Sequence, residues 1–200
     1  LVQLLNKYNI NGYNLLKKNS YIIEKGYYYE IDKTLKYLIN ELNVDPKNIE
    51  NAITSKTYMI IINHTSNVLG CTQNITEIGK IAKKYNLLFM VDTAQSGGHE
   101  NIDIKKQNIN LLCGTAHKGF YGPQGVGFLL INSAQVSPIK FGGTGTNSYS
   151  IIQPTNYPEA LESGTGPNPN IMGLLAGINF VEQNSTKINS KIKNTNPYSL

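Results

Sequence analysis

The chain has 200 residues and a net charge of +5, and all 18 of its basic residues are lysines. The lysines are spread along the chain and the two cysteines lack zinc-site or disulfide spacing, so the composition disfavours nucleic-acid binding, metal binding and secretion. The length suits one α/β core, and with no signal pattern or run of about 18 apolar residues we expect a cytoplasmic protein with no membrane partner.

The first predicted elements are a helix and a strand. Apolar residues between Leu35 and Leu42 recur on one helical face, and Asp45-Pro46 is the turn signal expected to end this helix. The β-branched run from Tyr58 to Ile62 is typical of a strand that is covered on both faces in a parallel sheet.

A second helix and strand follow. Apolar residues recur at helical spacing between Ile75 and Tyr85, with Asn74 as a candidate N-cap and Glu77 three residues later. The apolar run from Leu87 to Val91 then completes a strand-helix-strand unit, whose two strands we expect to be parallel.

The second half of the chain predicts two strands, a long loop and a helix. Strands are expected at residues 109–113 and 126–131, with antiparallel pairing or a sharp reversal between them. Residues 133–170 are rich in Gly, Pro, Ser, Thr and Asn, and a loop of this length in a compact domain is typically functional. Residues 171–181 predict a helix, whereas residues 184–200 are polar and weakly periodic and are expected to fray at the end.

Polar residues follow three of the predicted strands directly. They are Asn63 to Asn67, Asp92 to Gln95, and Gly114 to Lys118. In open α/β sheets ligands bind beyond the carboxyl ends of the strands. These three segments are therefore expected to line one crevice.

Asp92 and Lys118 suggest a pyridoxal phosphate (PLP) site. A carboxylate beside the pyridine nitrogen keeps it protonated, although turn formation is the ordinary role of an Asp at a strand end. Lys118 lies 26 positions later (118 minus 92), and its amine could form a Schiff base with the cofactor. Most lysines of a protein are solvent-exposed surface residues, but the glycine-rich segment from His117 to Gly127 distinguishes Lys118 from the others.

Three motifs together resemble the class V aminotransferase family of PLP enzymes, in particular its cysteine desulfurase and selenocysteine lyase branch. They are Asn63 to Gly70, Val91 to Gln95, and His117 to Gly127, in the family's order and at its approximate spacing. The resemblance is good over residues 55–180 and loose over residues 1–54. It implies an incomplete large domain of the PLP-dependent transferase fold type I, with a mostly parallel sheet flanked by helices.

The resemblance also implies roles for single residues. Lys118 would hold the cofactor as a Schiff base and act as the catalytic residue. Asp92 would pair with the pyridinium nitrogen, and Gln95 would bond to the phenolic oxygen. Thr115 and His117 would contact the phosphate.

Three further residues match the family less directly. Asn67 resembles the asparagine near the cofactor and substrate, whereas His64 could be either catalytic or a hydrogen-bonded strand-end histidine. Thr165 resembles a threonine that reaches the phosphate of the neighbouring subunit's cofactor, which implies a homodimer with shared active sites. The following Gly166-Pro167-Asn168 departs from the family's usual order at this point.

Several features of the family are expected to lie outside these 200 residues. Residues 1–183 would be a partial PLP-binding large domain and residues 184–200 a poorly defined tail. An N-terminal phosphate loop and a C-terminal small domain would be missing, the latter with the substrate-binding arginine and the sulfur-accepting cysteine. Cys71 and Cys113 adjoin strand-like segments and are expected to be buried, inert thiols.

The hypothesis for the parent protein is a cysteine desulfurase that converts L-cysteine to alanine, passes sulfur to its own cysteine and supplies a sulfur-acceptor protein. A class V aminotransferase or lyase with another amino-acid substrate shares every motif. A truncated, inactive chain that serves as an interaction module also stays open. A dinucleotide-binding protein is disfavoured because Gly122 to Gly127 precedes a predicted strand rather than a helix.

Overall fold

A computed structural model of the chain describes residues 43–68, 70–143, 145 and 149–195. The described residues form a four-stranded sheet of order β1-β2-β3-β4, in which β1, β2 and β3 are parallel and β4 is antiparallel to β3. This arrangement confirms the predicted mostly parallel α/β sheet and the antiparallel last pair. The strands are β1 (Met59–Asn63), β2 (Leu88–Asp92), β3 (Leu111–Thr115) and β4 (Gly127–Ile131).

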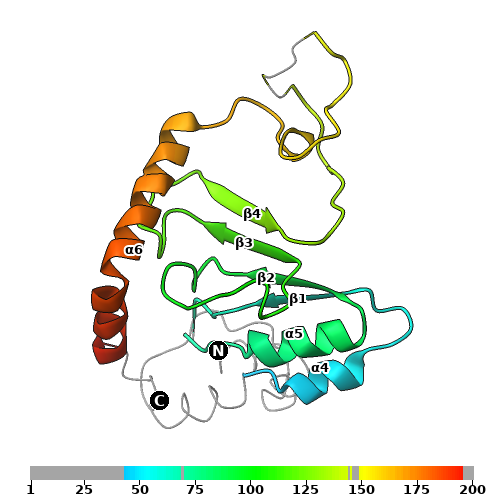
Figure 1. Cartoon of the computed structure of the whole chain (residues 1–200), viewed down its shortest axis with the longest axis vertical. Helices are drawn as coiled ribbons and strands as arrows, with labels where there is room; N and C mark the ends of the chain where they lie inside the picture. The colour runs from blue at the N-terminus through cyan, green and yellow to red at the C-terminus, as the bar shows by residue number, and fades with distance from the viewer. Residues whose placement is uncertain (1–42, 69, 144, 146–148, 196–200) are drawn as a thin grey trace, which may run out of the picture.

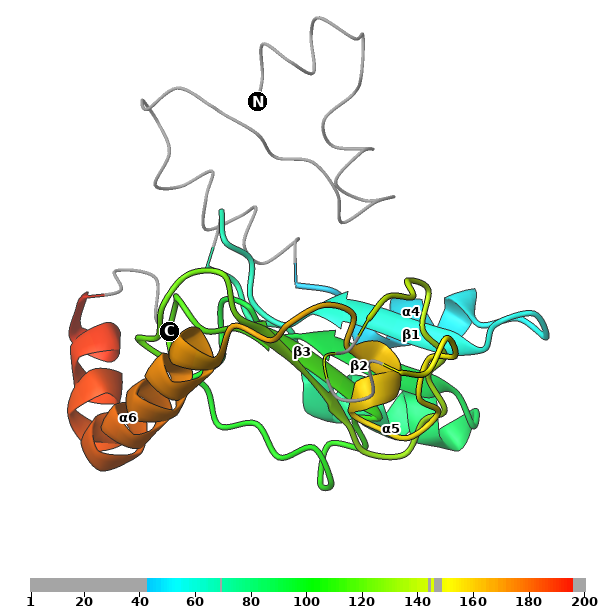
Figure 2. The same ribbon diagram turned by 90° about the horizontal axis from the view of Figure 1, so that it is seen from above.

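Within the described part of the chain, three α-helices and one 3-10 helix accompany the sheet. They are α4 (Pro46–Ala52), α5 (Ile75–Lys84), η1 (Glu159–Leu161) and α6 (Asn168–Thr195). α6 stands at one end of the sheet, where β3 ends, and α4 and α5 lie toward the other end (Figures 1 and 2). None of the helices among the described residues combines the length and the apolar character that a membrane crossing requires.

Asp45-Pro46 begins a helix, which corrects the expectation that it only ends one. The Asp45 side chain accepts a hydrogen bond from the backbone N–H of Lys47 at 2.9 Å, and Pro46 occupies the first helical position. An acidic N-cap followed by proline is a standard helix start, because proline has no N–H to leave unpaired there. The helix expected between Leu35 and Leu42 lies outside the described residues.

α5 begins and ends as its sequence predicts. Asn74 is the N-cap, and its side-chain oxygen accepts a hydrogen bond from the Glu77 N–H at 3.1 Å. After the helix Asn86 adopts a φ of 53°, and the Leu87 N–H donates to the Ala82 carbonyl at 2.8 Å. This left-handed ending turns the chain directly into β2.

The main hydrophobic core lies between α5 and one face of the sheet. Phe89 and Val91 of β2 are fully buried against Ile78 and Ala82 of α5. β1 is less covered than expected, since Ile61 is 65% exposed while its neighbour Ile60 is buried. The expectation that both faces of this strand are covered is therefore wrong, because β1 is an edge strand and α5 covers only one face.

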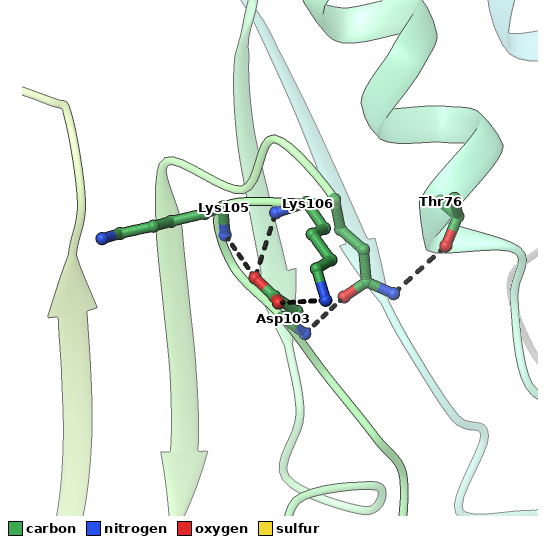
Figure 3. Close-up of polar contacts among 5 residues, drawn as sticks. Thr76, Asp103, Lys105 and Lys106 are labelled. Carbon is green, nitrogen blue, oxygen red and sulfur yellow. Dashed lines mark hydrogen bonds and ion pairs between the residues drawn. The ribbon is translucent and has the colours of Figure 1, made fainter.

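The turn between β2 and β3 packs tightly onto α5. A Cβ atom at Gly79 of α5 would overlap the carbonyl oxygen of Gln107, so only glycine allows this approach. Figure 3 shows how the turn is held: the Asp103 carboxylate accepts from the N–H groups of Lys105 and Lys106, at 3.1 and 3.0 Å. The Gln107 amide donates to Thr76 of α5 at 3.2 Å. These contacts fix the start of β3.

Two predictions for the last third of the chain have different outcomes. The segment after β4 is mostly irregular up to α6, as expected, and we call residues 133–167 the arm. It extends away from the sheet and is drawn in yellow in Figure 1. The tail expected to be poorly defined from residue 184 is instead helical as far as Thr195, because α6 continues to that residue with Ile188 buried. The end of the chain, where fraying is expected, lies outside the described residues.

Candidate functional site

The carboxyl ends of three parallel strands meet at one edge of the sheet. Asn63 is in register with Asp92, and Asp92 is in register with Cys113. Thr115 lies two positions after Cys113 on β3. Since side chains alternate along a strand and register partners share a face, all four residues project from the same face of the sheet. This face is opposite the one that packs on α5.

Asp92 ends β2 with a half-buried carboxylate. Its Oδ1 atom accepts a hydrogen bond from the Ala94 N–H at 2.8 Å, which orients the side chain. Its Oδ2 atom has no hydrogen bond within the part of the chain that the structure describes. One carboxylate oxygen is therefore available to a ligand at this edge.

Cys113 is a neighbour of Asp92 that the motifs did not reveal. The pKa of its thiol is raised by burial first and by the Asp92 carboxylate second. The Cys113 thiol also approaches the Val91 carbonyl at 3.8 Å. A raised pKa keeps the sulfur protonated and weakly nucleophilic, which agrees with the expected inert thiol, although Cys113 is half-buried rather than buried as expected. Burial likewise raises the pKa of Cys71.

The turn after Asp92 is held to β3 by Thr93. This side chain is 2% exposed, and its hydroxyl donates to the Cys113 carbonyl at 2.7 Å. Its backbone N–H reaches the same carbonyl at 2.8 Å, and its own carbonyl accepts from Gly97. Gln95 lies half-buried inside this turn. Thr93 is thus a structural support that could have been noticed from its place inside the Asp92 motif.

His64 is a buried, hydrogen-bonded strand-end histidine. Its Nδ1 atom lies 2.9 Å from the Ser96 hydroxyl, and its backbone N–H donates to the Asp92 carbonyl at 2.9 Å. Burial lowers the pKa of His64, and the negative charge of Glu100 opposes this effect. The structure therefore favours the second of the two interpretations of this residue, a satisfied histidine behind the site.

Lys118 lies in the loop between β3 and β4, which we call the Lys118 loop and which touches the turn after Asp92. The lysine is exposed, and a Cβ atom at the adjacent Gly119 would overlap the Gly97 carbonyl oxygen. Conversely, a Cβ atom at Gly98 would overlap the Gly119 carbonyl oxygen, and Gly98 has a φ of +84°. Contact between the two backbones requires glycine at these positions. The chain thereby brings the Lys118 loop against the turn that carries Gln95.

α6 covers the other side of the Lys118 loop. A Cβ atom at Gly177 of α6 would overlap the Phe120 carbonyl oxygen, so the helix approaches the loop backbone directly. Leu174 of α6 packs in a second core with Ala116 and Val126. The Tyr121 and Phe180 rings meet edge to face with 5.4 Å between centroids. The loop is therefore held between the turn and α6.

Thr115 and His117 form a polar pair just before Lys118. The Thr115 hydroxyl lies 2.9 Å from His117 Nδ1. The pair ends β3 at the edge that Asp92 occupies on β2. A hydroxyl and an imidazole in this position are suitable donors for an anionic group.

Two predicted site residues are not joined to this arrangement. Asn67 is exposed at the tip of the turn closed by the Thr65–Thr72 bridge. Thr165 is exposed in the arm, shortly before α6 begins. Among the residues described, no hydrogen bond links either of them to Asp92 or Lys118.

The residues at the edge have the donors and acceptors that PLP would need. Asp92 offers a carboxylate oxygen for a protonated ring nitrogen, and the pair Thr115 and His117 offers donors for a phosphate. The exposed Lys118 offers a primary amine, and Gln95 an amide. The glycine-rich segment from His117 to Gly127 leads into β4 rather than a helix, which confirms that it is no dinucleotide fingerprint.

Comparison with known proteins agrees with this arrangement. The family model for class V aminotransferases matches residues 31–199. A probable cysteine desulfurase of Pyrococcus abyssi is 35% identical over 152 residues, which cover 72% of this chain and 37% of that protein. Cysteine desulfurase IscS of Clostridium botulinum (strain Kyoto) is 33% identical over 151 residues, covering 76% of this chain and 35% of the relative.

A solved structure shows the same fold. The apo cysteine desulfurase of Thermococcus onnurineus NA1 matches with a TM-score of 0.64 at 35% identity, covering 71% of this chain and 36% of that one. This likeness confirms the predicted fold. The chain thus spans little more than a third of the length of these relatives, at 35–37%. On these grounds the chain belongs to the class V aminotransferase family.

Proposed function

We propose that this chain is the cofactor-binding part of a longer PLP-dependent cysteine desulfurase. The observation that carries the proposal is the convergence of Asp92 and Thr115 on one face of the sheet edge, directly before the loop of Lys118. The relatives named as cysteine desulfurases favour this activity over other reactions of the family.

Each candidate residue has a role that suits its position. Asp92 would accept a hydrogen bond from the protonated ring nitrogen, and the Gln95 amide would donate to the phenolic oxygen. Thr115 and His117 would hold the phosphate through their hydroxyl and imidazole groups. Lys118 would attach the cofactor through Nζ.

When bound, PLP supplies an electron sink that weakens the bonds at the α-carbon of an amino acid. Once the substrate amine had replaced Lys118 Nζ on the cofactor, the released lysine amine would serve as the base that accepts the α-proton. The loop of Lys118 is held between Gly97 and Gly177, so its amine would need little reorganisation to reach the same place in each cycle.

The proposal places the remaining parts of the enzyme outside the described residues. Residues 1–183 would belong to the large domain, with the arginine for the substrate carboxylate and the sulfur-accepting cysteine elsewhere in the full-length protein. L-cysteine is the proposed substrate, with transfer of sulfur to an acceptor protein. The proposal also places Asn67 near the cofactor and includes a homodimer in which Thr165 reaches the phosphate of the neighbouring subunit's cofactor. The exposed position of both residues supports these roles.

The test begins with cofactor binding by the full-length protein. We expect added PLP to give the absorbance of a lysine-bound cofactor, and Lys118→Ala to abolish it. Lys105→Ala is the matched control, because the Lys105 side chain points away from the turn contacts in Figure 3. This variant should bind PLP normally. Absence of the absorbance in the wild-type protein would contradict the cofactor assignment and favour an inactive interaction module.

Turnover tests the substrate. Incubation of the PLP-loaded protein with L-cysteine should release alanine, and a thiol-reducing agent should liberate the transferred sulfur as sulfide. If cofactor binds but cysteine gives no alanine, the desulfurase assignment fails and a transferase or lyase acting on another amino acid is supported.

A further inference from the structure

We propose that His64 and Ser96 form a buried positioning pair for the cofactor-binding turn and, through it, for the Lys118 loop. This inference rests on the proposed function, because it concerns how the proposed PLP ligands are held. Neither residue reaches the ligand face itself. Their effect passes through the backbone of residues 92–98.

His64 connects two strand ends. Its backbone N–H donates to the Asp92 carbonyl at 2.9 Å and its carbonyl accepts from Gln73 at 2.8 Å, so the main chain of this residue is fixed on both sides. Its Nδ1 atom then reaches the Ser96 hydroxyl at 2.9 Å. The imidazole therefore lies on the Asp92 turn in a defined orientation.

Ser96 is the centre of that turn. The side chains of His64 and Ser96 are buried, with residue exposures of 5% and 2%, so their hydrogen bond is shielded from water. The Ser96 carbonyl accepts from the N–H groups of His99 and Glu100, at 3.0 and 2.9 Å. Ser96 immediately follows Gln95, and a shift of Ser96 would move the Gln95 amide.

The turn transmits its position to Lys118 by direct backbone contact. Gly97 and Gly98, which follow Ser96, pack on Gly119 so closely that no side chain fits at Gly98 or Gly119. Because these backbones are in direct contact, a displacement of the turn also displaces the Lys118 loop. A change at the His64–Ser96 bond should therefore reach both the Gln95 amide and the Lys118 amine.

A purely structural bond would stabilise the fold without affecting the cofactor, so the experiment compares two buried or half-buried hydrogen bonds. Ser96→Ala removes the partner of His64, whereas Asn132→Ala removes the 3.0 Å bond that the Asn132 side chain donates to the Ile109 carbonyl, at the opposite end of the sheet. In the full-length protein we expect Ser96→Ala to raise the PLP dissociation constant about ten-fold, and Asn132→Ala to change it less than about two-fold.

A spectroscopic readout separates positioning from stability. The pH midpoint of the lysine-bound cofactor absorbance should shift in Ser96→Ala and stay unchanged in Asn132→Ala, because only the first changes the surroundings of the bound ring. Equal effects of the two variants on binding and on this midpoint would overturn the inference while leaving the proposed function intact.

Substitution of His64 provides a second test if Ser96→Ala does not fold. An asparagine amide can occupy the place of Nδ1, so His64→Asn should keep PLP affinity within about three-fold of wild type, whereas His64→Leu should lose about ten-fold. Equal affinities of these two variants would overturn the inference. Failure of the wild-type protein to bind PLP at all would overturn the proposed function together with it.

Discussion

The two glycine-rich regions of the molecule are packed in opposite ways. Around Lys118, a Cβ atom at Gly98, Gly119 or Gly177 would overlap a neighbouring carbonyl oxygen. In the arm, Gly143 and Gly164 have no heavy atom within 4 Å of a built Cβ position. Contact between backbones therefore requires glycine around Lys118, whereas no such contact requires glycine at these two positions of the arm.

Apolar side chains are likewise buried around Lys118 and exposed in the arm. Ala116 in the Lys118 loop is fully buried, whereas Ile139, Tyr149 and Ile151 of the arm are 101–102% exposed. Large apolar side chains gathered on one exposed segment are typical of a surface that another protein covers. The contrast teaches that the sheet edge that carries Asp92 and the Lys118 loop is fixed by the chain itself, and it supports a role for the arm in the proposed homodimer.

The largest effect is expected at Gly119. In Gly119→Ala the new methyl group would overlap the Gly97 carbonyl oxygen, so the loop or the turn must move. We expect a loss of about 2–4 kcal/mol in the free energy of unfolding, measured by urea denaturation, together with weakened PLP binding.

Gly143→Ala is the matched control for that substitution. Its new methyl group meets no atom within 4 Å, and the change should stay within about 0.5 kcal/mol. Similar losses in the two variants would show that the packing contrast between the regions does not exist in solution.

An intermediate effect on the free energy of unfolding is expected when the pH is lowered and His64 becomes protonated. Burial lowers its pKa in the folded chain, so the unfolded chain takes up the proton more readily. The contribution of His64 is therefore complete above about pH 6.5 and is lost as the pH falls below that value, toward the lowered pKa of the folded state. The free energy of unfolding should decrease with acidification in this window, and His64→Asn should reduce the slope. An unchanged slope in that variant would contradict a buried neutral histidine.

The smallest effect on stability is expected in the arm. Ile151 is fully exposed, so Ile151→Ser removes no internal packing and should change the free energy of unfolding by less than about 0.5 kcal/mol. The same variant should weaken self-association, which sedimentation velocity measures at several concentrations. A loss above about 1 kcal/mol in a monomeric sample would mean that this side chain is buried within its own chain.

Much of the fold was predictable because its signals are local. The N-cap Asn74, the strand after Tyr58 and the order of the last two strands follow from neighbouring residues. Asp45-Pro46 was interpreted only as the end of a helix, because the same kind of dipeptide can also begin one. The full length of α6 was missed because its last turns are polar, and the contacts of Leu174 and Ile188 are not visible in sequence spacing.

The sequence by itself determined the family motifs, the strand ends that carry Asp92 and Thr115, and the glycine pattern around Lys118. Only the tertiary structure decided that Cys113 lies beside Asp92, that His64 bonds to Ser96 and that Gly119 touches the Gly97 backbone. The physical reason is how far apart along the sequence the interacting residues lie. Capping and hydrophobic periodicity act between residues a few positions apart, whereas these contacts join residues separated by 21 to 32 positions and depend on how the strands align.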